Sequence, residues 1–128
     1  MVFISHSSKD RWLASQIAHH VRLKGGDPWL YEKEVEAGSI LAREIFEGID
    51  KCIEAIVLVS PNSIGSQWIM SEIGAIRGQH KRVTPILSNV SHDAIKPLSD
   101  VTAMDLNQID IYLRQLRERI EERRRSAI

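Results

Sequence analysis

The apolar run at residues 55–59 is the feature that most constrains the fold of this chain. Its letters are AIVLV, and no polar residue alternates with them. Such a run is typical of a central parallel strand that is covered on both faces. Parallel neighbours need crossover connections, which are usually helices. We therefore expect strands and helices to alternate along the chain.

The rest of the sequence shows this alternation. Further strand candidates lie at residues 2–4, 28–31, 83–87 and 101–104. Apolar residues recur at helical spacing over residues 12–23, 40–49 and 109–120, and the first pattern includes Trp12 and Leu23. Gly25 and Gly26 end that first helix, and a further helix is expected from Ser66 onward. The alternation predicts a three-layer α/β fold, with helices on both faces of a five-stranded parallel sheet.

Length and composition limit the class of protein. With 128 residues, the chain suits one domain over residues 1–128. Its 17 basic and 17 acidic residues cancel, so the charge predicts neither nucleic acid nor an acidic membrane as a partner. No run approaches the roughly 18 apolar residues of a membrane span, and no signal peptide is visible. The single cysteine, Cys52, cannot form an internal disulfide, so we expect a reducing, cytoplasmic location.

An aromatic residue and an acid share one face of the helix that follows the central run. Trp68 and Glu72 are four residues apart, which places their side chains one turn apart on that face. This helix starts at the carboxyl edge of the sheet, where ligands bind in open parallel sheets. Polar loops at residues 5–10, 31–38 and 60–66 reach the same edge. A tryptophan plane beside a carboxylate favours binding of a flat, positively charged leaving group.

Four stretches, taken in order, resemble the bacterial form of the Toll/interleukin receptor (TIR) domain. They are FISHSSKD at residues 3–10, GDPWL at 26–30, EAG at 36–38, and VLVSPNS with SQW and Glu72 at 57–72. The resemblance is specific up to about residue 87 and continues only as a pattern after it. It implies a flavodoxin-like fold, and it identifies residues 31–38 as the BB loop, through which neighbouring copies associate.

The resemblance also implies an activity. Many TIR domains of this form cleave NAD+ and release nicotinamide, so NAD+ would be a substrate here and no cofactor is implied. Glu72 matches the catalytic glutamate, and Trp68 matches an aromatic that lines the pocket. The other positions that the resemblance assigns to the substrate site are Phe3, Ser7, Ser8, Tyr31, Gly38 and Ile40. Tyr31 stands where family members often carry an aspartate, and Glu32 could take over that role.

The chemistry of this reaction suits a carboxylate. NAD+ cleavage breaks the bond between a ribose carbon and a cationic nicotinamide, so no strong general acid is required. The transition state resembles an oxocarbenium ion, which a fixed carboxylate such as that of Glu72 could stabilise. Attack by water would give ADP-ribose, and attack by the adenine ring would give a cyclic ADP-ribose isomer. The sequence leaves both products open.

Other chemistries find little support in the sequence. It contains no Gly-x-Gly-x-x-Gly motif, so a conventional dinucleotide-binding fold is not expected. His80 and His92 lack a carboxylate or cysteine at metal spacing, and His19-His20 lies within a helix, so we predict no metal. His6 is interpreted as polar loop surface.

Two alternatives to the enzyme were considered. The first is a non-catalytic scaffold that only pairs with other TIR domains in signalling. Glu72 and Trp68 favour the enzyme, because a pure adaptor needs neither. The second, a phosphoacceptor receiver, is disfavoured because Ser60-Pro61 stands where an acidic residue is required. The enzymatic interpretation implies activation by self-assembly and a role in bacterial defence against phage.

Overall fold

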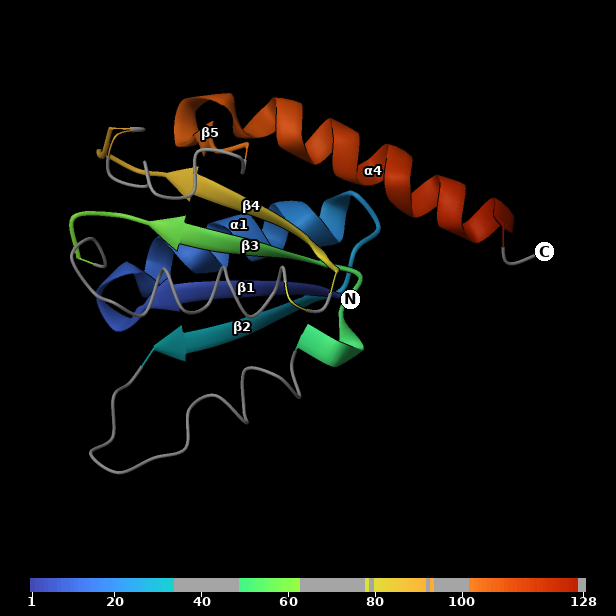
Figure 1. The fold of residues 1–128 in the computed structure, drawn as a ribbon, viewed down its shortest axis with the longest axis horizontal. Coiled ribbons are helices and arrows are strands. Elements are labelled where there is room, and N and C mark those ends of the chain that lie inside the picture. The colour runs from blue at the N-terminus through green and yellow to red at the C-terminus, as the bar shows by residue number, and fades with distance from the viewer. Residues whose placement is uncertain (34–48, 63–77, 79, 92, 94–101, 127–128) are drawn as a thin grey trace.

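The fold is built on one parallel sheet (Figure 1). The computed structural model describes residues 1–33, 49–62, 78, 80–91, 93 and 102–126. The strands are β1 (Val2–Ser7), β2 (Pro28–Lys33), β3 (Glu54–Val59), β4 (Arg82–Leu87) and β5 (Met104–Asp105). The described helical elements are η1 (Ser8–Asp10), α1 (Arg11–Leu23), η3 (Leu106–Gln108) and α4 (Ile109–Ser126).

The strand order confirms the predicted α/β, flavodoxin-like fold. The order is β2-β1-β3-β4-β5, and every neighbouring pair is parallel. This is the doubly wound order in which ligands bind where the direction of winding reverses, here between β1 and β3. The apolar run occupies the central strand, β3, and all six residues of that strand are buried. The sequence prediction of a strand covered on both faces is confirmed.

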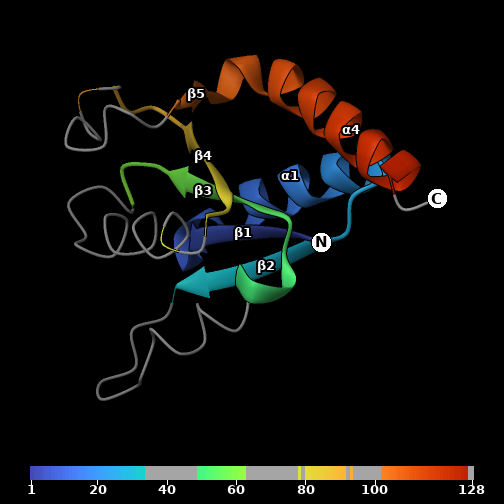
Figure 2. The ribbon, with the colours of Figure 1, turned by 45° about the vertical axis from the view of Figure 1, so that its right-hand side comes forward.

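Alternating side chains divide the core into two clusters, one on each face of the sheet. Val2 and Ile4 face the cluster that includes residues of α1 and α4, whereas Phe3 faces the other cluster. Figures 1 and 2 show α1 and α4 together on one side of the sheet. The second cluster includes Ile49 and Cys52, which precede β3. The period of two along β1 is what lets a short strand supply both clusters.

Helix α1 ends where the sequence predicts. Gly25 has a φ of 90°, a left-handed conformation that favours glycine. Its N–H donates to the Arg22 carbonyl oxygen at 3.0 Å, and the Gly26 N–H donates to that of Val21 at 3.0 Å. These bonds satisfy carbonyls at the end of the helix and turn the chain toward β2.

The buried face of α1 differs from the one expected. Trp12 is 74% exposed and Leu23 is 64% exposed, so the prediction that they belong to the apolar face was wrong. The buried residues of α1 are Ala14, Ile17, Ala18 and Val21. At about 100° per residue, Trp12 and Leu23 lie roughly opposite this stripe. The four buried residues belong to the core cluster that α1 shares with the sheet and α4.

The strands differ in length from those expected, most clearly at β1 and β5. Residues 5–7, expected in a loop, belong to β1 because they pair with residues 31–33 of β2. The fifth strand contains only Met104 and Asp105, which pair with Ile86 and Leu87 of β4. Most of the helix expected at residues 40–49 lies outside the described residues. Among the helices that the structure describes, none has the length and apolar character needed to cross a membrane.

Candidate functional site

The structure brings Ser7 and Ser8 to the carboxyl edge of the sheet. Ser7 is the last residue of β1, and Ser8 is the first residue of η1. The Ser7 hydroxyl oxygen accepts a hydrogen bond from the Lys9 N–H at 3.3 Å and so caps this short helix. Ser8 is exposed. Both residues therefore stand at the edge where the sequence predicts a substrate site.

Asp10 connects two loops at this edge. Its carboxylate accepts hydrogen bonds from the Ser60 hydroxyl at 2.5 Å and from the Asn62 side-chain amide at 2.8 Å. The Ser60 oxygen also accepts from the Asn62 N–H at 3.1 Å. Asp10 stands at the N-cap position of α1, but its side chain makes no capping hydrogen bond to that helix. The carboxylate instead ties the loop after β1 to the loop after β3.

Tyr31 and Phe3 form an aromatic pair between neighbouring strands. Their rings stack with centroids 5.6 Å apart and an interplanar angle of 27°, and Trp29 contacts Phe3 edge-on at 5.9 Å. Phe3 is fully buried near the amino end of β1, so the structure does not bring it to the edge with Ser7. It supports Tyr31 from the core. The predicted contacts of Phe3 and Tyr31 with a substrate stay predictions.

His6 is a buried strand residue. Its exposed fraction is only 2%, so the interpretation of His6 as polar loop surface was wrong. The residue lies within β1, and its Nδ1 donates a hydrogen bond of 2.9 Å to the Ser7 carbonyl oxygen. Its position two residues after Ile4 places it on the face of Val2 and Ile4. The error arose because the strand continues past its apolar residues.

Several predicted site residues lie outside the described residues. They are Gly38, Ile40, Trp68 and Glu72. The first three residues of the predicted BB loop, 31–33, form the end of β2, and residues 34–38 are outside the described part. The described portion of the site is therefore the end of β1 and the Asp10 connection. It also contains the start of the loop after β3, at residues 60–62.

A second polar cluster lies at the amino ends of the strands. Glu54 begins β3, and its side chain is buried. Its two carboxylate oxygens accept hydrogen bonds from Arg119 Nε at 2.8 Å and from a second guanidinium nitrogen of Arg119 at 2.9 Å. The Tyr112 hydroxyl donates to the same carboxylate at 2.8 Å. This anchor, formed by Glu54, Tyr112 and Arg119, fastens α4 to the central strand.

Burial and charge shift the titration of the anchor. Burial, together with the negative charge of Glu54, raises the pKa of Tyr112 well above its ordinary value. Burial alone would lower the pKa of Arg119, but the hydrogen bonds and charge of Glu54 raise it. The Arg119 guanidinium also lies 5.7 Å from the centre of the Tyr112 ring. The carboxylate is thus hydrogen-bonded on both oxygens, which suits a structural role.

The anchor was not predicted from the sequence, where Tyr112 falls within the apolar pattern at residues 109–120. One signal was present, because Tyr112 and Arg119 are seven residues apart and so share a helical face. Another was the acid directly before the apolar run. In the described ranges, no group of three His, Cys, Asp or Glu side chains is placed to hold a metal ion.

Comparison with known proteins agrees with the fold. Residues 2–120 match the TIR domain family. The 2′ cyclic ADP-D-ribose synthase BtTIR of Bacteroides thetaiotaomicron is 28% identical over 98 residues, covering 73% of this chain and 34% of that protein. The NAD(+) hydrolase TcpC of Escherichia coli O6:H1 is 26% identical over 107 residues, covering 79% of this chain and 35% of that protein. The chain thus spans about a third of the length of these two relatives.

A solved structure shows the same fold. It is the crystal structure of the RPS4 and RRS1 TIR domain heterodimer, with a TM-score of 0.69 and 17% identity. The match covers 95% of this chain and 96% of that one. At this identity the likeness concerns the fold alone.

Proposed function

Because this chain belongs to the TIR domain family, we propose that it cleaves the nicotinamide–ribose bond of NAD+. The products would be nicotinamide and either ADP-ribose or a cyclic ADP-ribose isomer. The observation that carries the proposal is the match to two relatives whose names describe an NAD(+) hydrolase and a cyclic ADP-ribose synthase. NAD+ serves as the substrate in this proposal, and no further cofactor takes part.

The described geometry supports a site at the carboxyl edge. Ser7 and Ser8 end β1 there, and Asp10 holds the loop after β3 through Ser60 and Asn62. That loop leads directly into the segment that contains Trp68 and Glu72. Fixing the start of this segment would help to orient its side chains, since catalysis requires groups that are positioned in advance.

Each residue has a distinct role in the proposal. The Glu72 carboxylate stabilises the positive charge that develops on the ribose, or holds the ribose hydroxyls. Trp68 covers the cationic nicotinamide, an interaction of roughly 0.5–2 kcal/mol. The hydroxyls of Ser7 and Ser8 contact polar parts of the substrate. Gly38, Ile40 and Tyr31 contribute from the BB loop and the strand that precedes it.

Self-association through the BB loop is part of the proposal. Residues 32–36 contain three glutamates, so this loop is acidic. A TIR domain heterodimer among the structures of the same fold supports association between such domains. Activity is then expected to rise more steeply than protein concentration. A role in bacterial defence against phage would follow if NAD+ depletion in infected cells depends on Glu72.

Incubation with NAD+ tests the activity. Wild-type protein at high concentration should release nicotinamide, and mass spectrometry of the remaining nucleotide should identify ADP-ribose or its cyclic isomer. Glu72→Ala should abolish release while its circular dichroism spectrum stays unchanged. A wild-type protein that associates but leaves NAD+ intact would overturn the proposal and favour the second candidate, a non-catalytic scaffold for TIR–TIR association. That candidate has the structural neighbour in its favour.

A further inference from the structure

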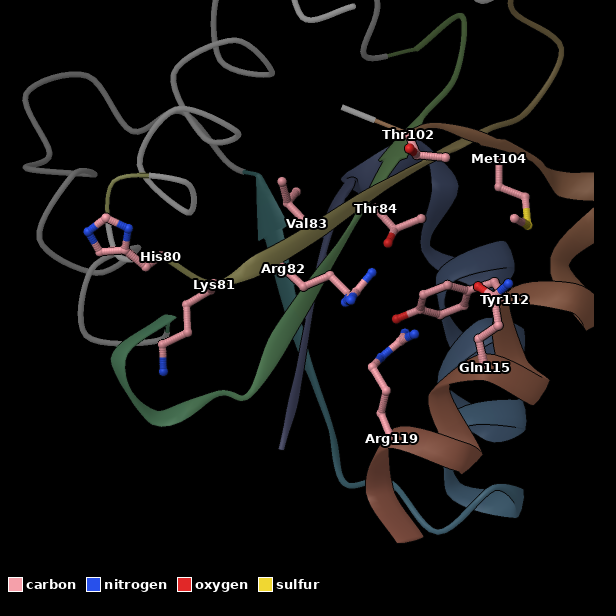
Figure 3. Close-up of a pocket in the computed structure, with 10 residues that line it drawn as sticks. All are labelled: His80, Lys81, Arg82, Val83, Thr84, Thr102, Met104, Tyr112, Gln115 and Arg119. Carbon is pink, nitrogen blue, oxygen red and sulfur yellow. The ribbon is translucent and has the colours of Figure 1, made fainter. Parts of the chain in front are cut away.

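A cavity lies between β4 and α4, away from the proposed reaction edge. Its volume is about 500 Å³ (Figure 3). The short strand β5 pairs with Ile86 and Leu87 of β4, and among the described residues no strand pairs with β4 at residues 82–85 on that side. The cavity therefore sits beside the amino end of β4. Its location is opposite to the carboxyl edge that carries Ser7 and Ser8.

Two arginine side chains from different elements converge on this cavity. Figure 3 shows Arg82, from β4, and Arg119, from α4, both extending toward the space beside Tyr112. Lys81 extends the other way, and its Nζ donates to the Cys52 carbonyl oxygen at 2.7 Å. The cationic groups that face the cavity are therefore the two guanidinium groups.

The two guanidinium groups differ in what they already bind. Arg119 is held by the Glu54 carboxylate through two of its nitrogens. This pairing fixes the orientation of Arg119. Because a guanidinium has five N–H groups, Arg119 still has N–H donors that could bind a ligand. Arg82 is exposed, and in the described part of the chain its guanidinium has no hydrogen bond or ion pair. Since Glu54 offsets the charge of Arg119, Arg82 gives the cavity a net positive charge.

A buried hydroxyl, that of Thr84, also lines the cavity. Thr84 is only 8% exposed, and Figure 3 shows it on the side of β4 that faces α4. Within the residues that the structure describes, its hydroxyl makes no hydrogen bond. Buried polar groups in folded proteins are almost always hydrogen-bonded. The position of this hydroxyl at the cavity wall thus indicates that a ligand oxygen in the cavity could accept its hydrogen bond.

We propose that this cavity binds the phosphate group of a small polar ligand. Planar guanidinium forks match phosphate oxygens and bind them through paired, charge-assisted hydrogen bonds. Arg82 and Arg119 supply these donors, and the Thr84 hydroxyl donates to a further oxygen. The cavity is larger than a phosphate group. Gln115 and Thr102 also line it, and their polar side chains could contact the rest of the ligand. This site is separate from NAD+ cleavage, and neither proposal depends on the other.

Nuclear magnetic resonance titration tests the site. The isotopically labelled chain is titrated with inorganic phosphate and separately with AMP, against sodium chloride at matched ionic strength. Saturable shifts are expected at the amides of Arg82, Thr84 and Gln115, and AMP should bind more tightly than inorganic phosphate. Shifts confined to Ser7, Ser8 and other residues of the carboxyl edge would overturn the assignment. Equal shifts in the sodium chloride control would also overturn it, because they would reflect ionic strength and not phosphate binding.

Matched variants separate specific binding from general charge. Arg82→Gln should weaken phosphate binding about tenfold, the effect of losing charge-assisted hydrogen bonds. Arg114→Gln removes the same charge from an exposed position of α4 outside the cavity, and it should bind like wild type. Thr84→Val should weaken binding without lowering the melting temperature, because within the described part of the chain the lost hydroxyl makes no hydrogen bond. Equal losses in Arg82→Gln and Arg114→Gln would overturn the proposal.

Discussion

The two ends of the parallel sheet use their carboxylates differently. At the amino end, Glu54 is buried, and within the described residues its carboxylate accepts hydrogen bonds from Tyr112 and Arg119 of α4. At the carboxyl end, Asp10 binds short polar side chains of another loop. The first arrangement fastens one element of the fold to another. The second positions loops around a surface that stays open to solvent.

This contrast shows how one fold separates stability from chemistry. A buried carboxylate with both oxygens hydrogen-bonded to the protein is poorly placed to act on a substrate, but removing it leaves its partners buried without a counter-charge, which is costly. A carboxylate that holds only loops contributes less to stability and more to the geometry of the edge. The proposed catalytic residue, Glu72, belongs by sequence to the carboxyl end. Substitutions at each end measure how far the two ends differ.

The largest effect on stability is expected at the amino end. Glu54→Ala removes the partner of Arg119 and Tyr112 and should lower the free energy of unfolding by about 3 kcal/mol. This loss is at the low end of the range for removing one partner of a buried ion pair, because the Arg119 side chain is a quarter exposed. Urea denaturation measures the change. Glu118→Ala, at an exposed position of the same helix as Arg119, is the control and should change little. A loss below 1 kcal/mol would show that the anchor does not stabilise the fold.

A smaller effect is expected at the carboxyl end. Asp10→Ala breaks the bonds to Ser60 and Asn62 and should cost about 1.5 kcal/mol, in line with hydrogen bonds to a charged group. Hydrogen exchange should accelerate at residues 60–62 and not at α4. Asp50→Ala, at an exposed position, serves as the control. If exchange rises equally in α4, Asp10 is not a local connection and the contrast between the ends is lost.

Sequence reasoning succeeded where a feature is local and failed where it joins distant residues. The central strand was predictable because its apolar run needs no knowledge of its partners, and Gly25 was predictable because a helix end requires its conformation. The end of β1 was missed, because Ser5 and His6 are held in a strand by pairing with β2. Glu54 and Arg119 are 65 residues apart, and no local pattern connects them.

Alkaline titration probes the amino end in a different way. Burial raises the pKa of the Cys52 thiol from 9.0 to about 11. The folded state therefore keeps this proton while the unfolded chain loses it, so stability falls as the pH rises above 9. The loss attributable to Cys52 should reach about 1 kcal/mol at pH 10. Unfolding measured from pH 8 to 10 should show a shallower slope in Cys52→Ala. An identical slope would show that the thiol does not contribute.

The smallest effect is expected on the outer face of α1. Trp12 is largely exposed, so Trp12→Ser should change the free energy of unfolding by no more than about 0.5 kcal/mol. Ile17→Ala, on the buried face of the same helix, should cost about 3 kcal/mol. Thermal unfolding of both variants checks the corrected orientation of the helix. A large loss for Trp12→Ser would place this tryptophan in the core after all.

The most direct test compares the two glutamates in one assay. Nicotinamide release and melting temperature are measured for wild type, Glu72→Gln and Glu54→Gln, with activity taken per folded molecule. We predict that Glu72→Gln loses at least about 100-fold in activity at an unchanged melting temperature. Glu54→Gln should show the reverse, with a lower melting temperature and activity near wild type. Wild-type turnover by Glu72→Gln would contradict the proposal that the carboxyl end of the sheet performs NAD+ cleavage.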